Sequence, residues 1–456
     1  MSLKWGPRDE RFKKYTKAIQ NLIAMSKFKE THKIKATDFT RNRKLNFITI
    51  VNIMLKKSSK SLQNTLNDSR EKLLNLSKKA YESVTASAYT RARAKLNYTA
   101  FIELSSLVRD EFYEDGDYQK FKGFRLLAVD GSIIILPYSE NIKTLFTPTI
   151  AKNQIEIFTK EVIQARASIL YDVMNNIVVD ATLKDKAYGE RVLAISHLQH
   201  TNKNDLILFD RGYPSIELFA NIIKNNSNFL IRIRRNSFKQ VAFLFDPKNT
   251  QSDITIEITA PKKLKEILIE NALPTTMTIR FVKVVLKTGE IEVLATNVLN
   301  HNILHTDDFK ELYNKRWGIE TFFYVLKNRL SLENFTGNTA LAVQQDFYIT
   351  IFLSNYESLL TYDSNILLKE KTKKYKNKQK VNKFISFNVI KQKSFELFYS
   401  DLDIDTTLKE MQKLFIMTPT AIRPNKLNRK RLDKEKDKST IYTNSTNFLK
   451  RKKKII

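Results

Sequence analysis

Two strand-like segments each carry one acidic residue where chemistry could occur. Asp130 interrupts the apolar segment LLAVDGSIII, and Asp210 follows the apolar residues LILF in LILFDRGYP. Because an unpaired carboxylate is costly to bury, each acid is expected to meet a cation, a hydrogen-bond donor or the open end of a sheet. Ligands of open α/β sheets bind at the carboxyl ends of strands. Each aspartate also has a structural interpretation, as a turn residue or as the cap of the next helix.

A third acid lies in the segment YNKRWGIETFFYVLKNRL, residues 313–330, which has the periodicity of one amphipathic helix. At about 100° per residue, four polar residues fall on one narrow face beside an apolar stripe: Tyr313, Arg316, Glu320 and Lys327. We predict that the helix packs by its stripe and places this polar row at the edge of the buried surface. The alternative is an exposed Arg316–Glu320 pair, which contributes only about 0.2–0.5 kcal/mol.

Three acids from two strands and one helix form an all-oxygen ligand set, which suits Mg²⁺ or Mn²⁺. Two such ions, roughly 4 Å apart, activate the attacking oxygen and stabilise the leaving oxygen of a phosphodiester. The sequence has no cysteine, which excludes disulfides and cysteine-based zinc sites. His197 and His200 are three residues apart, but no further His or Cys completes a site. We interpret the histidines as surface or core residues.

The charge of the chain indicates a polyanionic partner. The formal net charge is +30, from 78 Lys and Arg against 48 Asp and Glu, and such a surface attracts phosphates by counterion release. Nucleic acid is the first expectation. No apolar run approaches the roughly 20 residues of a membrane-spanning helix, and the N-terminus has no apolar signal core. We therefore expect no membrane partner and a cytoplasmic protein, with which the absence of cysteine is consistent.

The first part of the chain has helical periodicity from about Arg11 to Tyr113, which predicts an all-helical N-terminal domain over residues 1–120. Within it, a helix after a Ser/Thr-rich start carries three basic residues: Arg91, Arg93 and Lys95. A charged helix is most often a solvated face, but the excess charge of the chain favours DNA contact by these residues.

The middle of the chain predicts an α/β fold. Three strands, followed by alternating helices and strands, indicate a mixed sheet over residues 121–235 that continues at 294–360. Between them, the short β-like segments QVAFLF, DITIEIT and TMTIRFVKVVL predict an inserted β subdomain over 236–293, with PKKLKEILIE as its one expected helix. Residues 361–456 form a Lys-rich C-terminal region, whose last part, from Arg423, is predicted to be a flexible basic tail.

Taken together, Asp130 in AVDGS, Asp210 in FDRGYP and the pattern Y-x₂-R-x₃-E-x₆-K resemble the DDE transposases of the insertion-sequence-four family. The resemblance implies a ribonuclease-H-like catalytic core in which Asp130, Asp210 and Glu320 hold two divalent ions, Mg²⁺ or Mn²⁺. It also implies metal-dependent cleavage of one DNA strand by water, followed by strand transfer through the freed 3′-hydroxyl. No covalent enzyme intermediate and no nucleotide cofactor are expected.

The resemblance also implies DNA contacts and partners. Tyr313, Arg316 and Lys327 would contact phosphates at the cleaved end, and Arg211, beside the second acid, is a weaker candidate for the same role. The expected partners are double-stranded DNA, as transposon ends and target, and a second copy of the chain, because two ends must be paired.

The sequence departs from the family in its aromatic residues. Family members hold a flipped base with an aromatic group, including a Trp in the β subdomain, whereas the tryptophans here are Trp5 and Trp317. Trp317 is interpreted as a packing residue, and base stacking could be taken over by one of three phenylalanines: Phe243, Phe245 or Phe281.

Two alternatives to a complete transposase stay open. One is a catalytically inactive, transposase-derived DNA-binding protein or repressor, which the retention of all three acids argues against. The other is a ribonuclease-H-like nuclease or resolvase that cuts without joining, against which only the end-binding residues and the long insertion speak.

Overall fold

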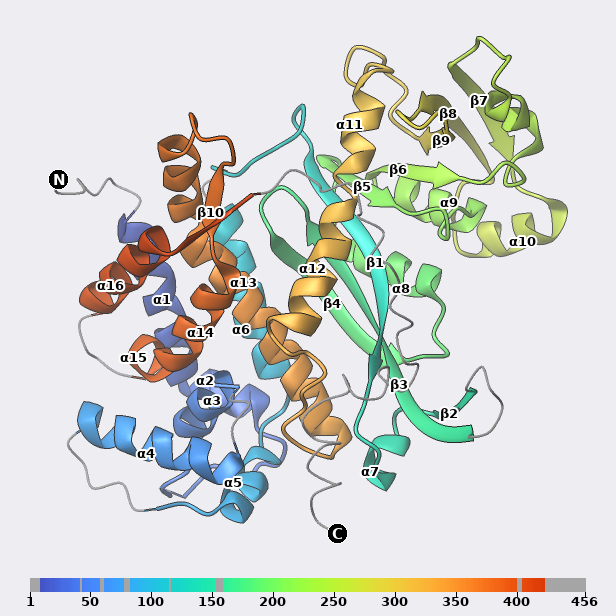
Figure 1. Ribbon diagram of the computed structural model, residues 1–456. Helices are drawn as coiled ribbons and strands as arrows, with labels where there is room; N and C mark the ends of the chain where they lie inside the picture. Colours follow the sequence, from blue (N-terminus) through green and yellow to red (C-terminus); the bar gives the residue numbers. More distant parts are fainter. Residues whose placement is uncertain are drawn as a thin grey trace. The chain divides into compact units, whose positions relative to one another are not determined.

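The computed structural model describes residues 9–41, 43–57, 61–77, 83–114, 116–152, 159–399 and 404–422. The predicted flexible tail from Arg423 lies outside these residues. The chain divides into two compact units (Figure 1). Unit 1 comprises Met1–Gly116, Ile135–Gln164 and Val325–Ile456, and unit 2 comprises Asp117–Ile134 and Ala165–Tyr324.

Unit 1 consists mainly of helices. Among the described residues, the helices before the first strand are α1 (Asp9–Ala24), α2 (Ser26–His32), α3 (Phe47–Leu55), α4 (Leu62–Ser77), α5 (Ala86–Arg93) and α6 (Thr99–Tyr113). Two short elements follow later in the chain, α7 (Glu140–Lys143) and β2 (Pro148–Lys152). The C-terminal part adds α13 (Ala340–Lys371), β10 (Gln379–Val381), α14 (Lys383–Gln392), α15 (Ser394–Phe398), α16 (Ile404–Met417) and β11 (Pro419–Ala421).

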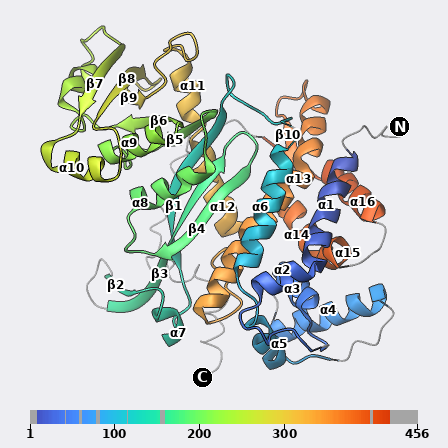
Figure 2. The same ribbon diagram turned by 180° about the vertical axis from the view of Figure 1, so that it is seen from behind.

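The core of unit 1 forms around α13. This helix is capped at its start by the Thr339 side chain, which accepts from the backbone N–H of Ala342 at 3.1 Å. From Gln345 to Thr361 every one of its residues is buried, as expected for a helix enclosed on all sides. It packs against α3, α6, α14 and α16, and Figure 2 shows α1 and α6 beside α13. The N-terminal helices and the C-terminal helices therefore share one core.

Unit 2 contains most of a mixed β-sheet. Its strands are β1 (Arg125–Ile135), β3 (Thr159–Asp172), β4 (Ile177–Asp185), β5 (Asp205–Phe209), β6 (Asn228–Ile233), β7 (Asp253–Thr259), β8 (Thr276–Val285) and β9 (Ile291–Thr296). The strand order is β2-β3-β1-β5-β6-β9-β8-β7, with β4 also paired to β3. Strands β1, β5 and β6 are parallel, and β6, β9, β8 and β7 are successively antiparallel. The expectation of a mixed α/β sheet is confirmed.

These strands are connected by α8 (Glu190–Ser196), the 3₁₀ helix η1 (His197–His200), α9 (Ile216–Lys224), the 3₁₀ helix η2 (Lys239–Phe245) and α10 (Lys262–Glu270). The last of these strands, β9, is followed by α11 (Asp308–Asn314) and α12 (Trp317–Asn328). Strands β1 and β3 and helix α12 cross the boundary between the units.

The segment predicted as an inserted β subdomain extends the main sheet. Its strands β7 and β8 join the sheet through β9, which pairs with β6 so that Leu230 lies opposite Thr296. The predicted helix is present as α10, but QVAFLF is the 3₁₀ helix η2 and not a strand. The fully buried residues of η2 are Val241 and Leu244, and a three-residue spacing suits a 3₁₀ helix.

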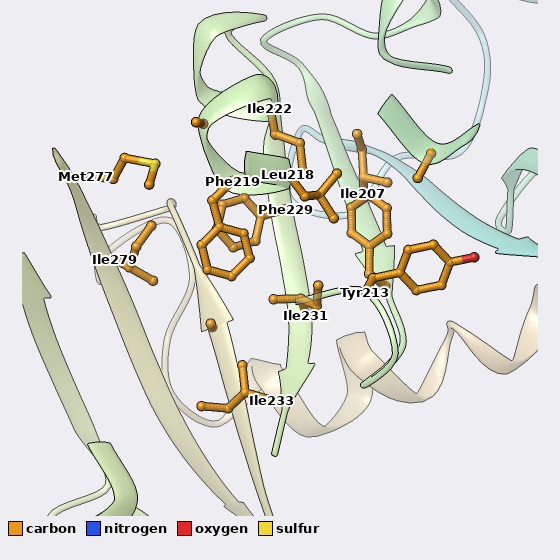
Figure 3. Close-up of a cluster of buried hydrophobic side chains, with 14 of the residues drawn as sticks. Ile207, Tyr213, Leu218, Phe219, Ile222, Phe229, Ile231, Ile233, Met277 and Ile279 are labelled. Carbon is orange, nitrogen blue, oxygen red and sulfur yellow. The ribbon is translucent and has the colours of Figure 1, made fainter. Parts of the chain in front are cut away.

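One face of the sheet in unit 2 carries the main apolar cluster, to which α8, α9, η2 and α10 contribute (Figure 3). Alternate strand residues point into it, as in the set Leu127, Val129, Ile207, Phe209, Phe229, Ile231 and Ile233. Successive side chains of a strand point to opposite faces, so Leu126, Ala128, Leu206 and Leu208 face the other way. Two residues beyond Ala128 and Leu208, the same alternation places Asp130 on β1 and Asp210 after β5 on the face opposite the apolar cluster.

Candidate active site

The two aspartates occupy equivalent positions on neighbouring parallel strands. The ladder between β1 and β5 ends with Ala128 opposite Leu208, and each aspartate follows two residues later. Adjacent strands are about 4.8 Å apart, so the two carboxylates start from neighbouring backbone positions at the carboxyl end of β5. Asp130 accepts from the N–H of Gly131 at 2.9 Å, and Asp210 accepts from the N–H of Gly212.

The pKa of Asp130 is affected by the other two predicted acids, Asp210 and Glu320. Burial raises the pKa of Asp130 to about 6, opposed by the hydrogen bond from Gly131 and by the charge of Arg316. Glu320 and Asp210 raise the pKa of Asp130 further, because like charges disfavour ionisation. All these residues belong to unit 2. Glu320, distant in sequence, therefore lies within electrostatic range of Asp130.

The segment that carries Glu320 is two helices, which corrects the prediction of one continuous helix over 313–330. Between α11 and α12 the backbone bonds connect residues three apart: Arg316 N–H to Tyr313 O at 3.0 Å, and Gly318 N–H to Lys315 O at 2.9 Å. These are 3₁₀-type bonds, which wind the chain more tightly than an α-helix. Tyr313 therefore lies in the last turn of α11, Arg316 lies in the turn between the helices, and Glu320 and Lys327 lie on α12.

A close packing contact accompanies this turn. A Cβ atom added to Gly318 would lie 3.2 Å from the Cβ of Val173, so a larger residue would press against the turn that follows β3. Close by along α12, the ring of Phe322 stacks on Tyr171 at 4.2 Å between centroids. These contacts hold the start of α12, and Glu320 with it, against β3 in unit 2.

Arg316 is buried, which rules out the exposed-pair alternative for Arg316 and Glu320. Its side chain is 7% exposed, and Nη2 donates to Oε1 of Glu320 at 2.7 Å. Burial opposes the charge of Arg316, yet its pKa is raised because Glu320, Tyr313 and Asp210 favour the cation. Its Nε is buried without a partner among the described residues. Glu320 itself is 39% exposed.

Two aromatic rings lie beside the Arg316 guanidinium. Its central carbon lies 5.0 Å from the ring centroid of Trp317 and 5.7 Å from that of Tyr313. Tyr313 is buried, and burial is the main reason why its pKa is raised. Trp317 is 55% exposed, so its interpretation as a packing residue was wrong. Instead its ring contacts the cation that binds Glu320.

The ligand set fits a hard divalent cation by chemical type, since all three candidate ligands are carboxylates. Their positions do not yet form a metal site. Within the described ranges, no three side chains of His, Cys, Asp or Glu gather closely enough to hold a metal ion. Glu320 accepts from Arg316 through Oε1, so a metal ion bound at Glu320 would face the Arg316 cation.

Sequence reasoning missed three residues that border the aspartates. Glu190, at the start of α8, lies so close to Gly131 that a Cβ there would be 3.5 Å from its Oε1. Arg166 on β3 pairs with Glu190. Tyr213 is 2% exposed, and its pKa is raised well above 10 by burial, then by the charges of Asp130, Glu190 and Asp210. The only available signal was Tyr213, which belongs to the same FDRGYP segment as Asp210.

A second group of missed residues lies beside Tyr313. Arg232 on β6 pairs with Glu290 at 2.9 Å and with Glu292 on β9 at 2.7 Å. Besides burial, Glu292 raises the pKa of Tyr313 and Arg232 lowers it. Burial raises the pKa of Glu292, and the charge of Arg316 lowers it. A chain of alternating charges therefore runs from the sheet to the turn that holds Arg316.

The predicted basic residues fall into different settings. Lys327 lies in unit 1, with its Nζ 3.9 Å from Oε1 of Glu333. Arg211 and Arg91 are exposed, and Lys95 is 40% exposed with Asp38 at 3.6 Å. Thr85 caps the helix of Arg91, as the Ser/Thr-rich start indicated.

Arg93 differs from these residues because it is buried. Its guanidinium donates to the Asp346 carboxylate at 2.9 Å, to Gln345 at 2.7 Å, to the carbonyl of Ala342 at 3.0 Å and to the hydroxyl of Thr336. This is an internal ion pair inside unit 1, a geometry that argues against the predicted phosphate contact by Arg93.

The aromatic and histidine expectations have mixed outcomes. Phe281 is fully buried and packs on Phe238, so it does not offer a face for base stacking, whereas Phe243 is 38% exposed. His197 is a core residue, bonded to Ser168 at 2.9 Å and to Asp180 at 2.6 Å. His200 lies 3.7 Å from the same aspartate, and neither histidine belongs to a metal-binding group among the residues described.

No helix in the described part of the chain is both long and apolar enough to cross a membrane. A search of curated proteins found no match. One solved structure, titled as a cryo-EM structure of the piggyBac transposase synaptic complex with hairpin DNA, is similar with a TM-score of 0.38 and 11% identity. The match covers 93% of this chain and 84% of that chain. Similarity at this level supports no conclusion about the site.

The comparison with protein families gives a clear result. The model of the family described as "Transposase DDE domain" matches residues 125–356, about half of the chain. The matched range starts with β1, which carries Asp130, and ends within α13, so it includes Asp210 and Glu320. DDE transposases in general are nucleases and transesterases that use divalent metal ions. The chain belongs to the transposase DDE-domain family.

Proposed function

We propose that this protein is the transposase of a bacterial insertion sequence of the insertion-sequence-four family, which binds terminal inverted repeats and moves DNA by cut-and-paste transposition. The observation that carries the proposal is the position of Asp130 and Asp210 at equivalent places on parallel strands, with Glu320 within electrostatic range. The mixed sheet around them supports a ribonuclease-H-like catalytic core.

Asp130, Asp210 and Glu320 are the proposed ligands of two Mg²⁺ or Mn²⁺ ions. When bound, such ions activate the attacking oxygen and stabilise the leaving oxygen of a phosphodiester. The residues of the chain perform the remaining tasks. The aspartates supply negative charge at the end of the sheet, and Arg316 neutralises part of it while the site holds no other cation. Release of Glu320 by Arg316 leaves the guanidinium to bind a DNA phosphate, for which its planar donor geometry is suited.

The same reasoning assigns DNA contacts around the site. Tyr313, Arg316 and Lys327 are proposed to bind phosphates at the cleaved end, with Arg211 as a further candidate. Arg91 and Lys95 remain proposed contacts of the helical N-terminal region. We infer that two copies of the chain pair two DNA ends, that the protein acts in the cytoplasm, and that it needs no nucleotide cofactor.

The test is cleavage of DNA that carries the element's ends, with Mg²⁺ or Mn²⁺ present. We expect Asp210→Asn and Glu320→Gln each to abolish nicking while end binding stays within about twofold. Glu311→Gln is the matched control, because Glu311 lies on α11 with its side chain 72% exposed, and it should cut normally. A variant of Asp210 or Glu320 that nicks at the normal rate would remove that residue from the site.

The same assay separates the alternatives. Wild-type protein that binds the ends but never nicks them with either ion would indicate a transposase-derived DNA-binding protein or repressor. Protein that nicks the ends but does not join them to target DNA would indicate a nuclease or resolvase.

A further inference from the structure

Tyr213 carries a buried hydroxyl that has no hydrogen-bond partner among the described residues. The side chain is 2% exposed, so bulk water does not satisfy the hydroxyl either. Buried polar groups in proteins are nearly always hydrogen-bonded, and an exception calls for an explanation such as a ligand or an ordered water. Phenylalanine would fill the same apolar space without leaving a polar atom unsatisfied.

The ring and the hydroxyl of Tyr213 have different surroundings. The ring belongs to the apolar cluster of unit 2, with its centroid 5.5 Å from that of Phe209. Figure 3 shows the hydroxyl oxygen pointing away from Phe219 and Ile231 of this cluster. The carboxylates that act on the pKa of Tyr213 are Asp130, Glu190 and Asp210. The hydroxyl thus remains protonated, and it is a donor on the loop that follows β5.

Other unpaired donors border the same carboxylates. Arg166 binds Glu190 through Nη1, but its Nε is buried without a partner in the described part of the chain. The Nε of Arg316 is buried and unpaired in the same way, on the side that carries Glu320. Three donors from β3, the loop after β5 and the α11–α12 turn therefore lie beside Glu190, Asp210 or Glu320 with unused hydrogen-bonding capacity.

This pattern is specific to the site and is not the rule for buried polar groups of unit 2. His197 is fully buried, yet both of its ring nitrogens are bonded, to Ser168 and to Asp180. Arg280, also fully buried, is bonded to Asp253 and to the carbonyl of Leu304. Among the described residues of unit 2, the buried side-chain atoms without a partner are the Tyr213 hydroxyl and the Nε atoms of Arg166 and Arg316.

We propose that the Tyr213 hydroxyl donates a hydrogen bond to an oxygen atom bound at Asp130 and Asp210, either a metal-bound water or a DNA phosphate oxygen. Tyr213 is then a positioning residue of the DNA-cleavage site, which the ligand oxygen completes. The proposal rests on the proposed function, because it requires the aspartates to bind a hydrated metal ion or DNA.

The experiment compares Tyr213→Phe with the wild type in the full-length protein. In EDTA, the unfolding temperature of the variant should equal or exceed that of the wild type, because an unsatisfied hydroxyl is removed. Mn²⁺ affinity is measured by electron paramagnetic resonance without DNA, and the affinity for end DNA is measured with Ca²⁺. We expect one of the two affinities to fall roughly three- to tenfold, the change that one hydrogen bond contributes.

The two arms identify the oxygen. Weaker Mn²⁺ binding without DNA assigns it to a metal-bound water, and weaker DNA binding alone assigns it to a phosphate. Unchanged values in both arms would overturn the proposal. So would a clear loss of stability in EDTA, because that result would show a structural hydrogen bond of the hydroxyl.

Two further variants keep the result unambiguous. Tyr356→Phe is the matched control, since the buried Tyr356 hydroxyl is 2.8 Å from Thr16 Oγ1 in unit 1. It should lower stability and leave Mn²⁺ affinity unchanged.

Asp210→Asn tests the site itself. If Asp210→Asn weakens Mn²⁺ binding and Tyr213→Phe changes neither affinity, only the Tyr213 proposal fails. If Asp210→Asn binds Mn²⁺ like the wild type, the proposed site fails.

Discussion

Arg316 donates from Nη2 to Oε1 of Glu320 at 2.7 Å, so the third acid of the proposed triad is bound by a cation of its own chain. The guanidinium also opposes the raised pKa of Asp130. It thus supplies positive charge to a cluster of carboxylates that would otherwise repel one another. Metal binding and Arg316 are expected to compete for Glu320.

Replacing Arg316 by Gln should make this competition visible. Loss of the cation leaves the carboxylates uncompensated, so we expect the metal-free protein to lose about 1–3 kcal/mol of stability. Mn²⁺ should bind roughly tenfold more tightly, because Glu320 is released. Thermal unfolding in EDTA and with increasing Mn²⁺ measures both effects. Lys315→Gln is the control, since Lys315 pairs with the exposed Glu311 at 3.2 Å. Equal Mn²⁺ affinities for Arg316→Gln and wild type would contradict the competition.

Asp130→Asn should stabilise the metal-free protein at neutral pH. The folded-state pKa of Asp130 is about 6, against an ordinary value of 3.8, so the folded state disfavours its charged form. Stability is therefore lost as pH rises from about 4 to above 6, by up to about 3 kcal/mol. Asparagine does not titrate, so the advantage of the variant should grow across this range and level off above it. Urea unfolding at pH 4, 6 and 8 in EDTA measures the difference, and a constant difference would refute the effect.

Gly318→Ala should destabilise unit 2 by pressing on Val173. The new Cβ would lie 3.2 Å from the Val173 Cβ, and a β-branched side chain adjusts poorly. Overpacking of this kind typically costs 1–3 kcal/mol, partly offset here by the better helix propensity of alanine, up to about 1 kcal/mol. We expect a net loss of about 1 kcal/mol. In a Val173→Gly background, which removes both close atoms of Val173, the same change should become neutral or stabilising, and a double-mutant cycle by urea unfolding reports the coupling. If the stability changes of the two substitutions simply add, the predicted clash between residue 318 and Val173 is contradicted.

Replacing Arg93 should cost far more stability than replacing Arg91, although both residues were predicted to contact DNA. Arg93→Met leaves the buried Asp346 without its cation, and breaking a buried pair costs about 3–5 kcal/mol. Arg91 is exposed, so Arg91→Met should change stability by less than about 0.5 kcal/mol. If Arg91 contacts a phosphate, its loss should lower the salt dependence of DNA binding by about one unit of slope. The double variant Arg93→Met with Asp346→Leu should regain most of the lost stability; failure to do so would argue against the ion pair as the cause.

The local sequence was sufficient for β1 and β5 and for the two aspartates, whereas it wrongly predicted a strand at QVAFLF. Apolar runs such as LLAV and LILF form buried strands wherever they meet a sheet, and an acid at the end of such a run stands out because burying it is costly. The helix that carries Glu320 was likewise visible from its periodicity, although the prediction joined it to α11. The 3₁₀ turn at Arg316 is accompanied by the close approach of Gly318 to Val173, a contact between segments distant in sequence.

The sequence by itself determined which residues could do chemistry: two strand-end aspartates, one helical glutamate and the cations near it. Only the tertiary structure decided how these groups are used. It buried Arg93 in an ion pair with Asp346, bound Glu320 to Arg316, and brought Tyr213 and Glu190 to the aspartates. The physical reason is that burial and charge pairing depend on distances between side chains far apart in the chain, and no local periodicity encodes those distances.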